Sequence, residues 1–183
     1  AGLSMTNGYV WITGMGSGTI TNAITIQGYA TTKAVQEQPV VMRLHSDGDL
    51  SCASATVTNG GMLAVGAGAQ TAGAFRVNGE IDVFTNSALY VHGHPTNGFT
   101  PIVTARKITV RLGGTISGTG RGYGGRDGAG GAYGPGAGGG TTSGGGHGGV
   151  GGGGSGGTTY GSSNAPVRSG SGGGGSASWP GGN

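Results

Sequence analysis

The distribution of glycine constrains this chain more than any other feature of its sequence. Glycine occupies 49 of the 183 positions, and 34 of these lie among the last 71 residues. Because each glycine in a helix costs about 1 kcal/mol relative to alanine, a conventional helical fold is excluded. The change in glycine content near residue 113 predicts two domains, residues 1–112 and residues 113–183.

The charge and hydropathy of the chain exclude several classes of protein. Charged residues make up 8% of the chain, and the net charge is +3. No stretch approaches the roughly 20 apolar residues of a membrane helix, and no block of like charge indicates an arm that binds nucleic acid. We therefore expect neither a nucleic-acid partner nor membrane insertion. The chain starts at Ala1 without a signal peptide, which indicates a removed leader or a piece of a longer protein.

Residues 1–112 contain many short stretches that alternate β-branched or other apolar residues with polar or small ones. This period of two predicts short strands with one apolar face. The stretches are 9–13, 19–26, 40–44, 55–58, 62–65, 75–78, 81–84, 89–92 and 108–112. The tripeptide Thr-Asn-Gly occurs at 6–8, 58–60 and 96–98, with looser copies at 21–22, 78–79 and 85–86. Asn and Gly tolerate the left-handed backbone of tight turns, so each copy predicts a bend.

Two all-β folds fit this first domain. Short strands joined by small corners are typical of a parallel β-helix, in which each turn of the chain stacks its aliphatic residues on the previous one. A β-sandwich with turn signals every 8–12 residues is the alternative, and Asn-Gly is also the favoured turn of antiparallel hairpins.

The second domain, residues 113–183, has a pattern of its own. His147 and Val150 stand three residues apart between glycines, and Ser155 and Thr158 keep the same step. A period of three is typical of the polyproline II helix, whose backbone groups have no partners within the helix. Only glycine faces let such helices approach closely enough to bond laterally. The pattern favours a packed bundle of polyglycine-II helices; a coil ordered by its neighbours and a flexible linker are the alternatives.

Several segments of this tract carry a resemblance to known proteins. They are Gly120-Arg-Gly-Tyr-Gly-Gly125, Gly144-Gly-Gly-His-Gly-Gly149, Thr159-Tyr-Gly-Ser162 and Gly170-Ser-Gly-Gly-Gly-Gly175. The tract resembles glycine-rich modules of bacterial and viral surface proteins, in which a β-helix runs into a polyglycine-II bundle. It is similar in architecture to the receptor-binding tip adhesins of tailed-phage long fibres. The resemblance implies an extracellular protein, on a cell surface or a virion fibre.

The large side chains of the glycine-rich domain are the candidate ligand-binding residues. Aromatic and arginine side chains dominate the energetics of many binding surfaces. The candidates are Tyr123, Arg126, Tyr133, His147, Tyr160 and Trp179. The alternative for the three tyrosines is that they cap helix ends and shield the bundle.

Residues that could support catalysis or cofactor binding are sparse. Asp47 and Asp49 flank a glycine and predict a solvated turn. His92 and His94 lack a nearby carboxylate or cysteine, which favours a structural loop over a metal site. We expect Cys52 to be a small buried hydrophobe, and no helix follows the glycine-rich motifs that resemble nucleotide loops. The sequence therefore predicts no enzyme, no catalytic residue, no metal and no cofactor.

Three functions remain, and none of them is enzymatic. The leading hypothesis is an extracellular fibre or adhesin protein that displays loops to a cell-surface receptor or glycan. The alternative is a purely structural subunit of an extracellular filament, whose partners are copies of itself. A third hypothesis is ice binding through Thr141, Thr142, Thr158 and Thr159, although the repeats are irregular.

Overall fold

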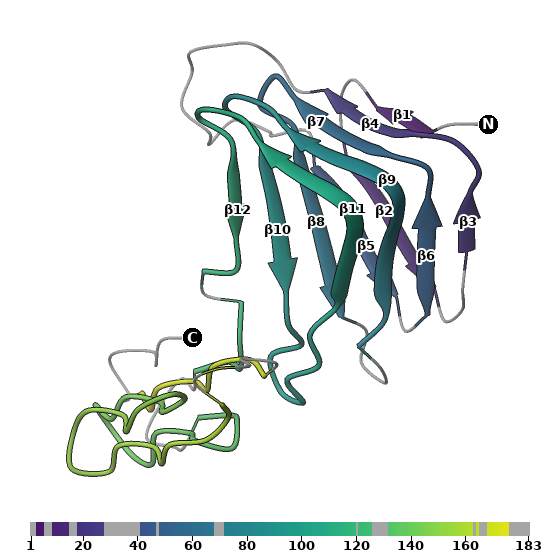
Figure 1. The fold of residues 1–183 in the computed structure, drawn as a ribbon. Coiled ribbons are helices and arrows are strands. Elements are labelled where there is room, and N and C mark those ends of the chain that lie inside the picture. The colour runs from purple at the N-terminus through teal and green to yellow at the C-terminus, as the bar shows by residue number, and fades with distance from the viewer. Residues whose placement is uncertain are drawn as a thin grey trace. The chain divides into compact units, whose positions relative to one another are not determined.

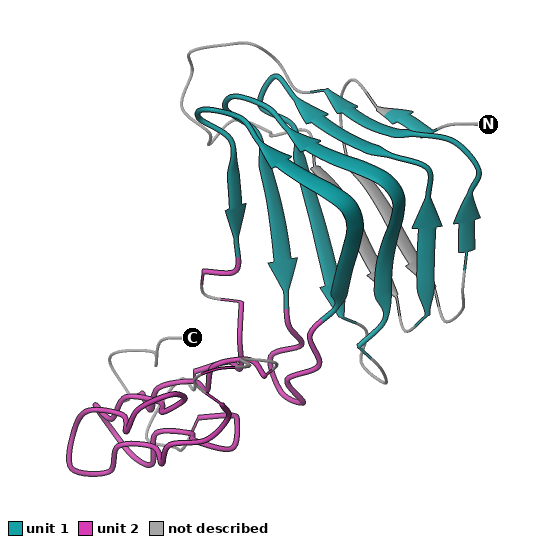
Figure 2. Cartoon of the chain, in the orientation of Figure 1, with its two compact units in different colours: residues 1–92, 101–117 teal, residues 93–100, 118–183 magenta. Residues whose placement is uncertain are grey.

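The computed structural model divides the chain into two compact units (Figure 2). Unit 1 comprises residues 1–92 and 101–117, and unit 2 comprises residues 93–100 and 118–183. The structure describes residues 3–5, 9–14, 18–27, 41–46, 48–67, 72–119, 121–125, 132–162, 164 and 168–175. The chain thus enters unit 2 briefly at residue 93, returns at residue 101 and leaves unit 1 for good after Ser117, whereas the sequence predicted a single boundary at 112/113.

Unit 1 is built from short strands, and the described residues of both units contain no helix (Figure 1). The strands are β1 (Leu3–Met5), β2 (Tyr9–Gly14), β3 (Gly18–Ile20), β4 (Ile24–Gln27), β5 (Val41–Ser46), β6 (Asp49–Cys52), β7 (Ala55–Thr58), β8 (Met62–Ala67), β9 (Ala74–Val83), β10 (Ala88–His92), β11 (Ile102–Val110) and β12 (Thr115–Ser117). The expected all-β class without α-helix is therefore confirmed for the described residues.

The strands form two sheets in which neighbours run parallel. One sheet has seven strands in the order β1-β4-β7-β9-β6-β3, with β11 also paired to β9, and the other has the order β12-β10-β8-β5-β2. Strands that follow one another along the chain do not pair. Paired residues lie from 21 positions apart, as for Leu3 and Ile24, to 32 apart, as for Tyr9 and Val41. The antiparallel hairpins that the sandwich alternative requires are absent from the described strands.

Parallel register places the apolar residues of successive strands in columns that form the core of unit 1. One column contains Ile24, Ala55 and Ile81, which are at most 1% exposed. A second contains Ile26, Val57 and Val83, all fully buried. Phe75 and Cys52 extend the same cluster, and Cys52 is buried as the sequence predicted. Burial in this apolar cluster raises the pKa of its thiol to about 11.

The turn predictions held at four of the five described Asn-containing sites and failed at one. Thr21 and Asn22 lie in a bend between β3 and β4. Asn59 and Gly60 both adopt positive φ in the turn after β7, and Asn86 and Gly98 do so in turns of their own. Gly79 instead lies inside β9, which pairs with β6 before this residue and with β7 after it. A Cβ at Gly79 would stand 2.7 Å from the carbonyl oxygen of Ala53, so glycine is needed here for close approach, and no turn forms.

Candidate functional site

Unit 2 is held together by hydrogen bonds between backbone segments that lie far apart in sequence. Gly144 donates to Gly152 (2.7 Å), Gly157 donates to Gly144 (3.0 Å) and Gly138 donates to Gly172 (3.1 Å). The glycines packed between these segments have no room for a side chain, because a Cβ at Gly151 would overlap the carbonyl of Gly144 and one at Gly157 would overlap the carbonyl of Gly136. Backbone groups thus occupy the positions that apolar side chains fill in unit 1.

The segment 93–100 belongs to this unit through Tyr123. The Tyr123 hydroxyl donates to the carbonyl of Asn97 (3.1 Å), and the Tyr123 ring lies where a Cβ of Gly98 would be. Gly98 also has a φ of 71°, which disfavours any other residue. The amide of Gly93 donates to the carbonyl of Arg121 (2.8 Å). Tyr123 therefore fastens the segment 93–100 within unit 2.

Ser169 connects the same segment to Tyr160. The Ser169 hydroxyl donates to the carbonyl of Gly98 (3.3 Å) and also bonds the hydroxyl of Thr100. The Tyr160 hydroxyl donates to the backbone carbonyl of Ser169. Both tyrosine hydroxyls are thus engaged by backbone carbonyls of unit 2.

His147 packs against Tyr160 at the edge of this network. The two rings meet edge to face with centroids 4.9 Å apart, and the Tyr160 amide donates to the His147 carbonyl (2.8 Å). His147 Nε2 lies 3.1 Å from the carbonyl of Arg168. Because a carbonyl only accepts, Nε2 is the donor in this contact. The structure therefore brings two candidate residues, His147 and Tyr160, into direct contact.

Other large side chains of unit 2 are turned toward solvent. Tyr133 is 42% exposed and Val150 is 74% exposed. Arg121 and Arg168 are also exposed. The Tyr133 backbone is fixed at both ends, because its amide donates to Gly124 (3.1 Å) and its carbonyl accepts from Gly172 (3.0 Å). Tyr133 thus combines an exposed ring with an anchored backbone.

Arg126 and Trp179, the remaining candidates, lie outside the described residues. The hydroxyl residues considered for ice binding fall on separate segments. Thr141 and Thr142 occupy a turn in which Thr142 has a φ of 66°, and Thr158 and Thr159 lie on a different segment.

The histidine and aspartate pairs take part in local contacts. His94 Nδ1 accepts from the amide of Thr96 (3.4 Å), which closes the turn at residues 94–98. Asp49 forms an exposed ion pair with Arg76 (2.9 Å), and Asp47 lies outside the described residues. The described residues contain no cluster of three or more His, Cys, Asp or Glu side chains that could hold a metal ion.

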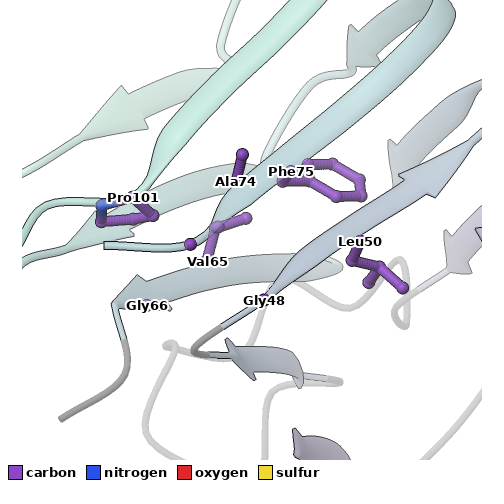
Figure 3. Close-up of a pocket in the computed structure, with 8 residues that line it drawn as sticks. Gly48, Leu50, Val65, Gly66, Ala74, Phe75 and Pro101 are labelled. Carbon is purple, nitrogen blue, oxygen red and sulfur yellow. The ribbon is translucent and has the colours of Figure 1, made fainter. Parts of the chain in front are cut away.

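Unit 1 contains a small apolar cavity (Figure 3). Its volume is about 10 Å³, and its walls include Leu50, Val65, Phe75 and Pro101. A space of this size holds at most one water molecule, and a water needs several polar partners to stay there. The cavity is therefore a packing defect and does not form a ligand site.

The sequence missed the residues that position the aromatic side chains. Asn97, Thr100, Ser169 and Ser171 supply hydrogen bonds within unit 2, and Ser171 Oγ accepts from the amide of Gly136 (2.9 Å). Small polar residues next to glycines occur throughout the tract, so nothing in the sequence distinguishes Ser169 and Ser171 from the others. The Thr-Asn-Gly tripeptide at 96–98 predicted the turn but not its association with unit 2.

Comparison with known proteins adds no further assignment. No family model, curated protein or solved structure matches the chain. In the described part of the chain, no helix is long and apolar enough to cross a bilayer.

Proposed function

We propose that this chain is a non-enzymatic extracellular fibre or adhesin protein that displays the exposed turns of unit 2 to a cell-surface receptor or glycan. In this proposal unit 1 is a parallel β-helix that serves as a stiff support. Unit 2 is a bundle of polyglycine-II-type segments whose turns carry the contact residues.

The parallel register supports a β-helix for unit 1. Ile24, Ala55, Ile81 and Ile108 occupy equivalent positions in four strands, and each strand pairs with one that comes 26 to 31 residues later (Figure 1). Gly18, Leu50, Phe75 and Val103 form a similar series on other strands. A chain that coils and stacks each turn on the previous one produces this pattern.

The glycine contacts support a polyglycine-II-type packing for unit 2. Positive φ angles fall at Gly134, Gly140, Gly153 and Gly161. The glycines packed between segments, such as Gly146, Gly151 and Gly157, do not have positive φ. Extended segments that bond laterally through glycine faces have these properties.

The observation that carries the functional proposal is the exposed Tyr133 ring on an anchored backbone. A rigid aromatic residue contributes contact area to a ligand at low entropic cost. Val150 and Arg168 are exposed on the same unit and add apolar and cationic groups. Tyr123, His147 and Tyr160 then hold the loops in place, which corresponds to the shielding role considered for the tyrosines.

Binding measurements on whole bacterial cells, envelope extracts and a glycan array test this proposal. We expect Tyr133→Ala to weaken binding by about tenfold or more, as truncation of an aromatic hot spot does. Phe84→Ala is the matched control, because Phe84 is an exposed aromatic residue (37%) of unit 1. Its effect should stay within about twofold, the level of a residue outside the contact.

Two results would overturn the adhesin proposal. One is the absence of binding to any cell, extract or glycan by protein whose circular dichroism shows a folded chain. The other is an equal loss of binding in the Tyr133 and Phe84 variants. Tyr160→Phe separates an effect on the fold of unit 2 from an effect on ligand contact. It removes the hydroxyl that bonds the carbonyl of Ser169 but retains the aromatic ring.

A purely structural filament subunit is the second candidate. The observation that favours it is the exposure of core residues on the last strands of unit 1, where Ile108, Val110 and Ile116 are 43%, 45% and 46% exposed. The cell-binding measurements distinguish the two candidates, since a filament subunit without a ligand forms regular polymers in electron micrographs but binds no cell.

A further inference from the structure

The core of unit 1 is open at its last strands. Ile108 continues the column of Ile24, Ala55 and Ile81, yet it is 43% exposed whereas Ile81 is fully buried. Val110 continues the column of Val83 and is 45% exposed. Residues that face the core elsewhere are half exposed here because no described strand stacks on them.

The second sheet ends in the same way. Leu63 and Leu89 are at most 1% exposed, whereas Ile116, which follows Leu89 in register, is 46% exposed. Among the described strands, β11 pairs only with β9, and β12 pairs only with β10. One edge of each last strand is therefore a template for a further parallel strand.

We propose that this end binds the first strands of a second copy of the chain, so that copies stack head to tail. The apolar column that ends at Ile108 begins at Leu3 on β1, and Leu3 packs partly buried against the core. In the stack, Leu3 of one copy takes the next position after Ile108 of its neighbour. The columns of the two copies then join without a change in register or strand direction.

Charge favours this head-to-tail arrangement over a pairing of two last strands. Arg106, Lys107 and Arg111 lie within six positions on and after β11, whereas residues 1–32 carry no charged side chain. Lys107 and Arg111 form exposed ion pairs with Glu80 and Asp82 (4.0 and 3.0 Å), whereas residues 102–111 themselves contain no acidic side chain. Two β11 edges would place like charges on adjacent strands, and such pairs destabilise a sheet.

The stack has a consequence for assembly. A head-to-tail contact uses two different surfaces, so it does not close on itself unless a rotation completes a ring, and it generates filaments. Each copy would contribute one unit 2 to the filament. The inference concerns unit 1 alone and stands or fails independently of receptor binding.

An engineered disulfide tests the register directly. In a Cys52→Ala background, Leu3→Cys combined with Ile108→Cys should give a ladder of disulfide-linked chains on a non-reducing gel after mild oxidation. Adjacent parallel strands lie about 4.8 Å apart, which is within the reach of a disulfide. Leu3→Cys combined with Thr109→Cys is the off-register control, because residue 109 faces the opposite side of the strand. It should stay uncrosslinked.

The single variants and the unmodified chain complete the test. Linked dimers from Ile108→Cys alone would overturn the proposal in favour of contact between two last strands. Absence of a ladder in the double variant, with a folded circular dichroism spectrum, would overturn it as well. Sedimentation of the unmodified chain should show association that increases with concentration, and Val110→Lys should return it to monomer; a monomer at every concentration contradicts the stack.

Discussion

The two units of this chain solve the problem of a stable interior in different ways. Every buried hydrophobic residue in the described part of the chain belongs to unit 1, where aliphatic side chains stack in columns. In unit 2 the buried positions include Gly136, Gly146, Gly157 and Ser143, and carbonyl oxygens lie where side chains would otherwise pack. An interior can therefore be built from side chains or from the backbone itself.

This difference predicts opposite sensitivities to substitution. Unit 1 is stabilised by apolar area removed from water, so it loses stability when side chains are shortened. Unit 2 depends on lateral hydrogen bonds between closely spaced segments, so it loses stability when side chains are added. The entropic cost of ordering glycine is high, and many lateral bonds must form together to offset it.

The largest effect that we expect is the truncation of a buried column residue in unit 1. Ile81→Ala should lower the free energy of unfolding by about 4 kcal/mol, because it removes a fully buried side chain and leaves a cavity. Ile108→Ala is the matched control in the same column, and its side chain is 43% exposed. Its cost should be about 1 kcal/mol, in proportion to the smaller area that it buries.

Denaturant unfolding, measured at low protein concentration, tests this pair. Equal losses for Ile81→Ala and Ile108→Ala would show that the last strands are covered even in the monomer. Such a result would also remove the structural basis of the proposed head-to-tail stack.

The second effect concerns adjacent glycines of unit 2. Gly151→Ala should cost about 3 kcal/mol, because the new Cβ would overlap the carbonyl of Gly144 and force the segments apart. Gly152→Ala is the matched control, since no atom lies within 4 Å of a Cβ there. It should be neutral or stabilise the unit by a few tenths of a kcal/mol, because alanine restricts the unfolded chain.

Hydrogen exchange of the amides in residues 144–160 gives a local measurement of these variants. Gly151→Ala should accelerate exchange across the whole segment, whereas Gly152→Ala should leave it unchanged. Similar exchange in the two variants would mean that unit 2 is a loose coil, whose stability does not depend on close packing of backbone segments.

Much of unit 1 could be predicted from the sequence, because side-chain periodicity determines which face of a strand is buried. The stretches at 55–58, 62–65 and 89–92 lie within strands β7, β8 and β10. The long strand β11 was predicted only from residue 108 onward, since Arg106 and Lys107 obscure its alternation. Gly79 was wrongly assigned to a turn. An Asn-Gly pair that forms a turn and one that lets a strand approach Ala53 closely look the same in the sequence.

Less of the candidate site could be predicted, because partners in unit 2 are selected by backbone geometry. The three-residue step from His147 to Val150 predicted the type of backbone, but the contact of His147 with Tyr160 depends on how separate segments fold back. Likewise, nothing distinguishes Ser169 from neighbouring serines, although it bonds Gly98 and Thr100. A glycine-rich sequence indicates which segments are able to approach one another closely, but it does not determine which of them pair in the folded chain.

The smallest expected effect is a pH dependence confined to the core of unit 1. Burial raises the pKa of the Cys52 thiol from 9.0 to about 11, so the folded chain favours the neutral thiol. The stability that this provides is fully present below pH 9, the pKa of the thiol in the unfolded chain, and is lost as the pH rises toward 11.

Comparison of the unmodified chain with Cys52→Ala isolates the contribution of the thiol, because the tyrosines and lysines titrate in both. The difference between their free energies of unfolding should shift by about 2 kcal/mol between pH 9 and pH 11, against the unmodified chain. A difference that stays constant over this range would show that the thiol titrates alike in the folded and unfolded states, and that water reaches the aliphatic columns around it.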